Sequence, residues 1–144
     1  FCIPDSRGSL INFKSGSKKL TLVDESYNSN PLSLKFALER YDSLFKKKNK
    51  KFLLIGNMLE LGKYSKKLHI KIAKYINRSK INKAYFYGKQ TKHTFNKLRP
   101  QIKGKILNNK MDIHRLLNND LPKNSFLMVK GSNSTGLNKI IQSL

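Results

Sequence analysis

Apolar residues occur along this chain in two kinds of run, short continuous ones and longer ones with helical spacing. Continuous runs of four lie at 52–55, 84–87 and 126–129, and a glycine closes the first two. Such runs are typical of strands buried on both faces of a parallel sheet. Between them, apolar residues recur every three or four positions, most clearly after Pro31 and Ser65, and this spacing predicts helices.

The beginning of the chain has a different pattern. Ser9–Phe13 and Leu20–Asp24 are strand-like and are joined by the turn-forming residues 14–17, which predicts an antiparallel hairpin at a sheet edge. Weaker patterns predict a helix at 91–98, a short strand at 105–107, a helix at 112–117 capped by Asp112, and a closing helix at 137–144.

Strands and helices that alternate at this spacing predict an α/β fold. We expect a Rossmann-like three-layer domain with a mostly parallel sheet and the hairpin at its antiparallel edge. Ligands of such domains bind beyond the carboxyl ends of the strands. Functional residues should therefore lie in the loops at 24–30, 56–62, 88–91 and 130–136.

Charge is the strongest feature of the composition. The 144 residues include 30 Lys and Arg but only 8 Asp and Glu, a formal net charge of +22. This balance suggests a basic nucleic-acid-binding module as an alternative function. However, 25 of the 30 cations are lysines spread along the chain, whereas nucleic-acid readers gather arginine and aromatic residues on one face. A nucleic-acid partner is therefore the weaker interpretation.

Other bulk features concern the compartment. The single cysteine, Cys2, allows no internal disulfide, which suits a reducing cytoplasm. No apolar run approaches the ~20 residues that a membrane span needs, so we expect no membrane partner.

The loop after the second predicted strand is rich in polar side chains: Asp24, Glu25, Ser26, Tyr27, Asn28, Ser29 and Asn30. Carboxylates can accept hydrogen bonds from a ribose diol or an amine, and the following helix start offers N–H donors to an anion. A simple strand-to-helix turn with an Asn cap would explain Asn30 but not the whole polar string.

Two more loops follow buried strands. Residues 56–62 contain Asn57 and Glu60, and Lys130 precedes Gly131 and Ser132. Lys130 could pair with a carboxylate or a phosphate, while the next residues offer exposed N–H groups. Ordinary polar turns remain the alternative for both loops.

Several other signals are weak. Gly88–Thr91 resembles the end of a phosphate-binding loop, but the upstream glycine of that motif is absent. The three histidines, His69, His93 and His114, lack cysteines or carboxylates at ligand spacing, so no metal site is expected.

The three polar segments, in their order, resemble motifs of the Mur ligase family. Asp24–Pro31 corresponds to D-[DE]-S-Y-N-A-N-P, Gly56–Gly62 to G-D-M-L-E-L-G, and Val129–Asn133 to V-K-G-S-R. The first two motifs are long and specific, and the resemblance covers essentially the whole chain. It is greatest to the branch that adds D-alanyl-D-alanine, and the alternative within this resemblance is a related Mur or folylpolyglutamate-type ligase domain that adds another amino acid.

This resemblance implies a domain organisation and a reaction. Residues 1–8 would be a lead-in from a missing central ATP-binding domain, and residues 9–144 the C-terminal domain of the ligase. The whole enzyme would use ATP and Mg²⁺, both bound mainly by the missing domain, to join D-Ala-D-Ala to UDP-N-acetylmuramoyl-tripeptide through an acyl phosphate. Its partners would be the central and N-terminal domains, and the isolated domain would be inactive.

The resemblance also implies residue roles. Arg7, Asp24 and Glu25 would face the nucleotide. The residues around the dipeptide would be Tyr27, Asn28, Ser29, Asn30, Asn57, Glu60, Lys130, Gly131 and Ser132. The chain departs from the family pattern at Ser6 (usually Gly), Ser29 (Ala), Asn57 (Asp) and Asn133 (Arg), and the last two changes together remove a possible ion pair.

Overall fold

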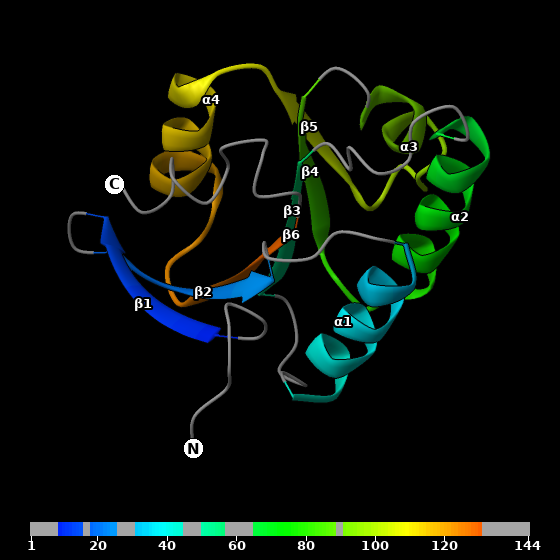
Figure 1. The fold of residues 1–144 in the computed structure, drawn as a ribbon. Helices are drawn as coiled ribbons and strands as arrows, with labels where there is room; N and C mark the ends of the chain where they lie inside the picture. Colours follow the sequence, from blue (N-terminus) through cyan, green and yellow to red (C-terminus); the bar gives the residue numbers. More distant parts are fainter. Residues whose placement is uncertain are drawn as a thin grey trace.

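A computed structural model describes residues 9–15, 18–25, 31–44, 50–56, 65–88 and 91–130 of the chain (Figure 1). Strands and helices alternate along it, as the sequence predicts. The elements are β1 (Ser9–Ser15), β2 (Lys18–Glu25), α1 (Pro31–Leu44), β3 (Lys51–Gly56), α2 (Ser65–Arg78), β4 (Lys83–Tyr87), α3 (Lys92–Asn96), β5 (Lys103–Leu107), α4 (Lys110–Arg115), the π-helical turn η3 (Leu116–Asp120) and β6 (Ser125–Lys130).

The described strands form one six-stranded sheet in the order β1-β2-β6-β3-β4-β5. The first two strands pair antiparallel, and every other neighbouring pair is parallel. The predicted α/β class, the mostly parallel sheet and the antiparallel edge hairpin are thus confirmed. The last described strand, β6, inserts between β2 and β3, and this places three strand ends of distant sequence next to one another.

Helices cover both faces of the sheet. In Figure 1, α1, α2 and α3 lie on one side of the strands and α4 on the other. The handedness of parallel crossovers explains this division. The connections from β2 to β3, β4 and β5 advance across the sheet in one direction, whereas the connection from β5 to β6 runs back, so its helix must cover the opposite face.

Strand alternation divides the core into two clusters. Leu53 and Ile55 pack with α1 and α2 residues such as Leu38 and Ile72. Their neighbours in β3, including Leu54, pack with residues of α4 and η3 on the other face. All six residues of β3 are buried, which is why the sequence there is a continuous apolar run rather than an alternating one.

Polar contacts fix α1 at the amino-terminal edge of the sheet. The Tyr41 hydroxyl donates to the Phe52 carbonyl at 3.1 Å and accepts from the Phe52 N–H at 3.3 Å. The buried Lys51 ammonium lies 3.4 Å from the Asp42 carboxylate, which also accepts from the backbone N–H of Lys80. Helix and strand are therefore joined by hydrogen bonds at the edge opposite the predicted loops.

One predicted helix cap was wrong. Asn109, not Asp112, is the N-cap of the fourth helix, and its side chain accepts from the Asp112 N–H at 2.9 Å. Asp112 lies in the first turn and accepts from the Asn108 N–H at 2.8 Å. Both residues are good caps, so their order was decided by where the chain leaves β5. The predicted closing helix at 137–144 lies outside the described residues.

Candidate functional site

The carboxyl ends of the central strands form one rim of the sheet. In the parallel register between β2 and β6, Glu25 pairs with Lys130 and Asp24 with Val129. On the other side of β6, Lys130 pairs with Ile55, the residue before Gly56. Adjacent strands lie about 4.8 Å apart, so the backbones of Glu25 and Ile55 are separated by about 10 Å. The three polar segments predicted from the sequence therefore begin within the span of a small ligand.

Lys130 is the central residue of this rim. It is 1% exposed and is among the largest fully buried side chains. Strand alternation puts it on the same face as Met128, the face that α1 and α2 cover. A lysine is rarely buried to this degree unless its ammonium is paired, and burial in a strand holds its position closely. Among the described lysines only Lys51, at the other end of the sheet, is comparably buried.

The described part of the rim is only its base. Backbone positions are described for Asp24 and Glu25, and both backbone and side chain for Lys130. The remaining predicted site residues lie outside the described residues: Arg7, Tyr27, Asn28, Ser29, Asn30, Asn57, Glu60, Gly131 and Ser132.

The end of β4 is a structural turn. Gly88 has a φ of 113°, a conformation that glycine adopts without the strain a side chain would bring. The buried Thr91 hydroxyl donates to the Gly88 carbonyl at 2.5 Å. The hydroxyl that would end a phosphate-binding loop is thus used to close the turn before α3.

A buried histidine between α2 and α3 was not singled out by the sequence. His69 is 2% exposed, and its Nδ1 lies 2.5 Å from the Thr94 hydroxyl, which itself donates to the His69 carbonyl. Because the hydroxyl proton already points to that carbonyl, the ring proton of His69 lies on Nδ1 and is donated to the hydroxyl oxygen. The other ring nitrogen, Nε2, is buried without a hydrogen-bond partner. Burial lowers the pKa of His69, and the neighbouring His93, with ring centroids 6.3 Å apart, lowers it further. The arrangement favours a neutral, structural imidazole.

Among the described residues, no three His, Cys, Asp or Glu side chains are grouped closely enough to bind a metal ion together. Within the same residues, every helix is too short or too polar to cross a membrane.

An open, mostly parallel sheet with helices on both faces defines a Rossmann-like domain, a fold whose ligands generally bind at the carboxyl rim. The comparison with known families is more specific. Residues 11–133 match the family described as "Mur ligase, glutamate ligase domain". The chain belongs to this family.

Relatives of known function match most of the chain. The chain is 30% identical over 135 residues, or 94% of its length, to the UDP-N-acetylmuramoyl-tripeptide–D-alanyl-D-alanine ligase of Rickettsia prowazekii. The ligase of the same name from Buchnera aphidicola of Acyrthosiphon pisum is 33% identical over 85% of the chain. These matches cover 29% and 26% of the two relatives, so the chain spans less than a third of their length.

Solved structures show the same fold. The chain superposes on MurF ligase from Thermotoga maritima in complex with ADP with a TM-score of 0.69 and 20% identity, covering 98% of the chain and 30% of the ligase. For MurF from Acinetobacter baumannii, the TM-score is 0.68 at 17% identity, with 95% of the chain and 29% of the ligase covered.

Proposed function

We propose that the chain is the C-terminal domain of an ATP-dependent ligase that adds D-alanyl-D-alanine to UDP-N-acetylmuramoyl-tripeptide. Family membership and two relatives with this name support the assignment. The observation that carries it is the register at the rim, where Glu25, Lys130 and Ile55 lie side by side. Three motifs that are far apart in sequence thereby begin at one place.

The roles proposed for the rim follow from its chemistry. Asp24 and Glu25 supply acceptors for the hydroxyls of a nucleotide ribose, with Arg7 facing the phosphates. The buried Lys130 supplies a fixed positive charge for the carboxylate of the dipeptide or for the transferred phosphate. The side chains of Tyr27, Asn28, Ser29, Asn30, Asn57 and Glu60, with Gly131 and Ser132, complete the dipeptide side.

In the proposed reaction this domain orients the dipeptide and does not itself form or break bonds. The tripeptide carboxylate attacks the γ-phosphorus of ATP, ADP leaves, and an acyl phosphate remains. The dipeptide amine then attacks the acyl carbon, loses a proton, and phosphate departs to leave an amide. A domain that holds the amine beside the acyl carbon contributes through proximity and charge stabilisation. ATP and Mg²⁺ are held mainly by the central domain in this proposal, and the enzyme works in the cytoplasm, where ATP is supplied.

A domain exchange tests the proposal. The matching segment of the Rickettsia prowazekii ligase is replaced by this chain, and ADP release is measured with UDP-N-acetylmuramoyl-tripeptide in the presence and absence of D-Ala-D-Ala. We expect release that depends on the dipeptide. ADP release that requires a different amino acid would assign the chain to another branch of the family. ADP release that depends neither on D-Ala-D-Ala nor on another amino acid would overturn the proposal.

A variant in the exchanged ligase tests the rim itself. Lys130→Met keeps the buried stem but removes the charge, and we expect kcat/KM for D-Ala-D-Ala to fall about 10- to 100-fold, since hydrogen bonds to charged groups are worth ~1.5–3 kcal/mol. The matched control is Lys123→Met, because Lys123 is exposed near the opposite end of the same strand. Equal activity of the two variants would remove Lys130 from the site.

A further inference from the structure

One part of the chain carries positive charge without any negative charge. Residues 61–111 contain 15 Lys and Arg residues and no Asp or Glu. This segment includes all of α2, β4, α3 and β5. The rim described above uses none of the cations of these two helices, so their charge needs a separate explanation.

Four of these cations form a single row along α2. Lys67, Lys71, Lys74 and Arg78 are all exposed and follow one another at intervals of four, three and four residues. Positions with this spacing lie on one narrow stripe of a helix. At ~1.5 Å per residue the row is about 16 Å long. The opposite side of α2 is packed in the core, so the row is the outermost part of this layer.

The adjacent helix α3 widens the basic surface. It lies beside α2 (Figure 1), and the Asn77 side chain links the two by donating to the Lys97 carbonyl at 3.2 Å. Lys92 and Lys97 are exposed there. The apolar side chain of Ile70 is 37% exposed on the outer side of α2.

This arrangement is unfavourable for the isolated helix. Lysines three or four residues apart repel one another, and the first turn of α2 has no acidic residue to balance the helix dipole. Among the described residues, Lys67, Lys71 and Lys74 form no ion pair with a carboxylate. A partner with many negative charges would relieve this repulsion.

The side chains on the surface indicate which polyanion fits. Nucleic-acid surfaces offer aromatic rings for stacking and free arginine forks. Here the aromatic residues Tyr75 and Phe95 pack against the core. Of the two arginines, Arg99 has its guanidinium held by the Asn77 carbonyl at 2.8 Å, and Arg78 is the one arginine in a row of exposed lysines. Lysines around one exposed isoleucine suit phospholipid headgroups, which attract basic clusters and admit an apolar side chain at their boundary. We infer that the α2–α3 surface binds reversibly to a membrane rich in anionic phospholipids. This surface contact departs from the expectation of no membrane partner, which rested on the lack of a spanning segment.

The inference is tested with the 144-residue chain and sedimented vesicles. One set of vesicles is pure phosphatidylcholine, and the other contains phosphatidylglycerol as well. We expect binding to the second set only, weakened by salt. In the surface variant, Lys67, Lys71 and Lys74 are changed to Gln. Each lysine near an anionic surface contributes ~1 kcal/mol, so we expect the binding constant to fall on the order of 100-fold.

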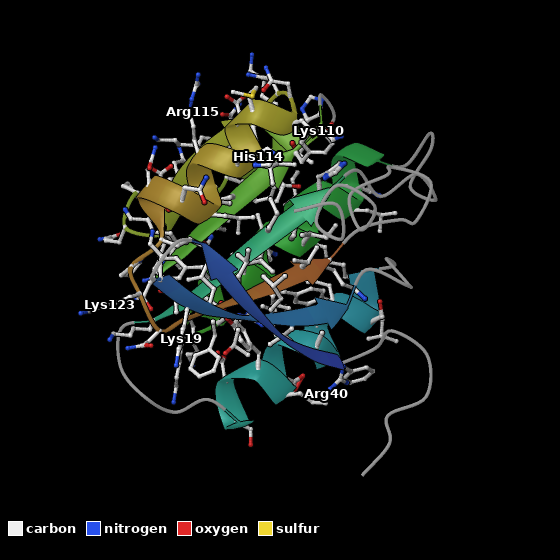
Figure 2. All side chains as sticks on the ribbon, turned by 90° about the vertical axis from the view of Figure 1, so that its left-hand side faces the viewer. Lys19, Arg40, Lys110, His114, Arg115 and Lys123 are labelled. Atoms are coloured by element: carbon white, nitrogen blue, oxygen red, sulfur yellow. The ribbon has the colours of Figure 1, made fainter. Side chains whose placement is uncertain are left out.

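A matched control separates a defined surface from general charge. Lys19, Lys110 and Lys123 are exposed on the face shown in Figure 2, away from α2. Their change to Gln removes the same charge, and we expect a loss of less than about tenfold because these lysines lie outside the contact. Equal losses in the two variants would overturn the inference. Thermal unfolding of both variants checks that the fold is kept.

Two further measurements decide between lipid and nucleic acid. Ile70→Ser is expected to lower vesicle binding about threefold, because part of an apolar side chain is lost from the interface. Binding to duplex DNA is measured at the same ionic strength. Tighter binding to DNA than to vesicles, with the same sensitivity to the three α2 lysines and none to Ile70, would assign the surface to nucleic acid and contradict the inference.

Discussion

Gly104 lies where β5 passes close to β4. A Cβ atom at this position would be 2.7 Å from both the Ala84 carbonyl oxygen and the Tyr85 ring. The carbonyl belongs to the backbone of a buried strand, so it cannot move aside as a surface side chain would. The register between the two strands also shifts between Ala84 and Phe86. The glycine therefore permits a close, irregular strand pairing.

We expect Gly104→Ala to lower the free energy of unfolding by about 1–2 kcal/mol. Overpacking of this kind costs ~1–3 kcal/mol, and the lower entropy of the unfolded alanine chain offsets a part. Denaturant unfolding measures the change. Lys105→Ala on the same strand is the control. It removes only an exposed ion pair, in which the Lys105 ammonium lies 3.4 Å from the Asp120 carboxylate, and should change stability by under about 0.5 kcal/mol. A stability equal to that of the parent chain would show that the strands can separate at no cost.

His69 makes stability depend on pH. Its pKa is lowered in the folded chain by burial and by His93, so the unfolded chain binds more protons just below pH 6.5, the ordinary histidine value. The contribution is fully present above about pH 6.5 and is lost as the pH falls toward the lowered folded pKa. We expect His69→Leu to flatten the decline in unfolding free energy below about pH 6.5. An unchanged slope, measured by denaturant unfolding across this range, would contradict this role.

At the scale of elements, a lysine of β2 holds the end of the fourth helix. At the end of the π-helical turn η3, backbone carbonyls lack helical hydrogen-bond donors. The Lys18 ammonium donates to the carbonyls of Asn118, in η3, and Leu121, just after it, both at 2.6 Å. The Leu117 carbonyl is 3.4 Å away. A cation at this position also opposes the helix dipole. The contact joins residues about a hundred positions apart.

We expect Lys18→Met to destabilise the chain by about 1 kcal/mol, because the orphaned carbonyls lose charged donors at a partly exposed site. Backbone hydrogen exchange should become faster in η3 before it becomes faster in the sheet. Lys19→Met is the matched control, since its neighbouring side chain is exposed and makes none of these contacts. Equal exchange rates in the two variants would mean that water replaces the ammonium without loss.

The sequence predicted the type of most elements but not their ends. The apolar runs of β3, β4 and β6 and the helical spacing of α1 and α2 were sufficient because burial on both faces or on one stripe leaves a direct pattern. The cap at Asn109 and the turn η3 were missed. The start of α4 depends on where the chain leaves β5, and the end of η3 depends on its contact with Lys18 of β2. Neither contact can be recognised from a local sequence pattern.

At the scale of the molecule, the sheet separates two surfaces with different chemistry. Segments with acids and a buried lysine meet at the carboxyl rim, whereas the charged residues of α2 and α3 are all positive. The first supports the proposed ligase function and the second the inferred membrane contact. In the proposed ligase, the rim works only when other domains close onto it.

The sequence by itself determined the fold class and the three polar segments, because buried strands, amphipathic helices and long motifs can each be recognised from residues that are close together in the chain. Only the tertiary structure decided that β6 lies between β2 and β3, so that Glu25, Lys130 and Ile55 are adjacent. It also decided that Lys130 is buried and that His69 meets Thr94. The physical reason is that strand order and burial result from packing between segments far apart in the sequence. Local periodicity does not indicate which segments pack together.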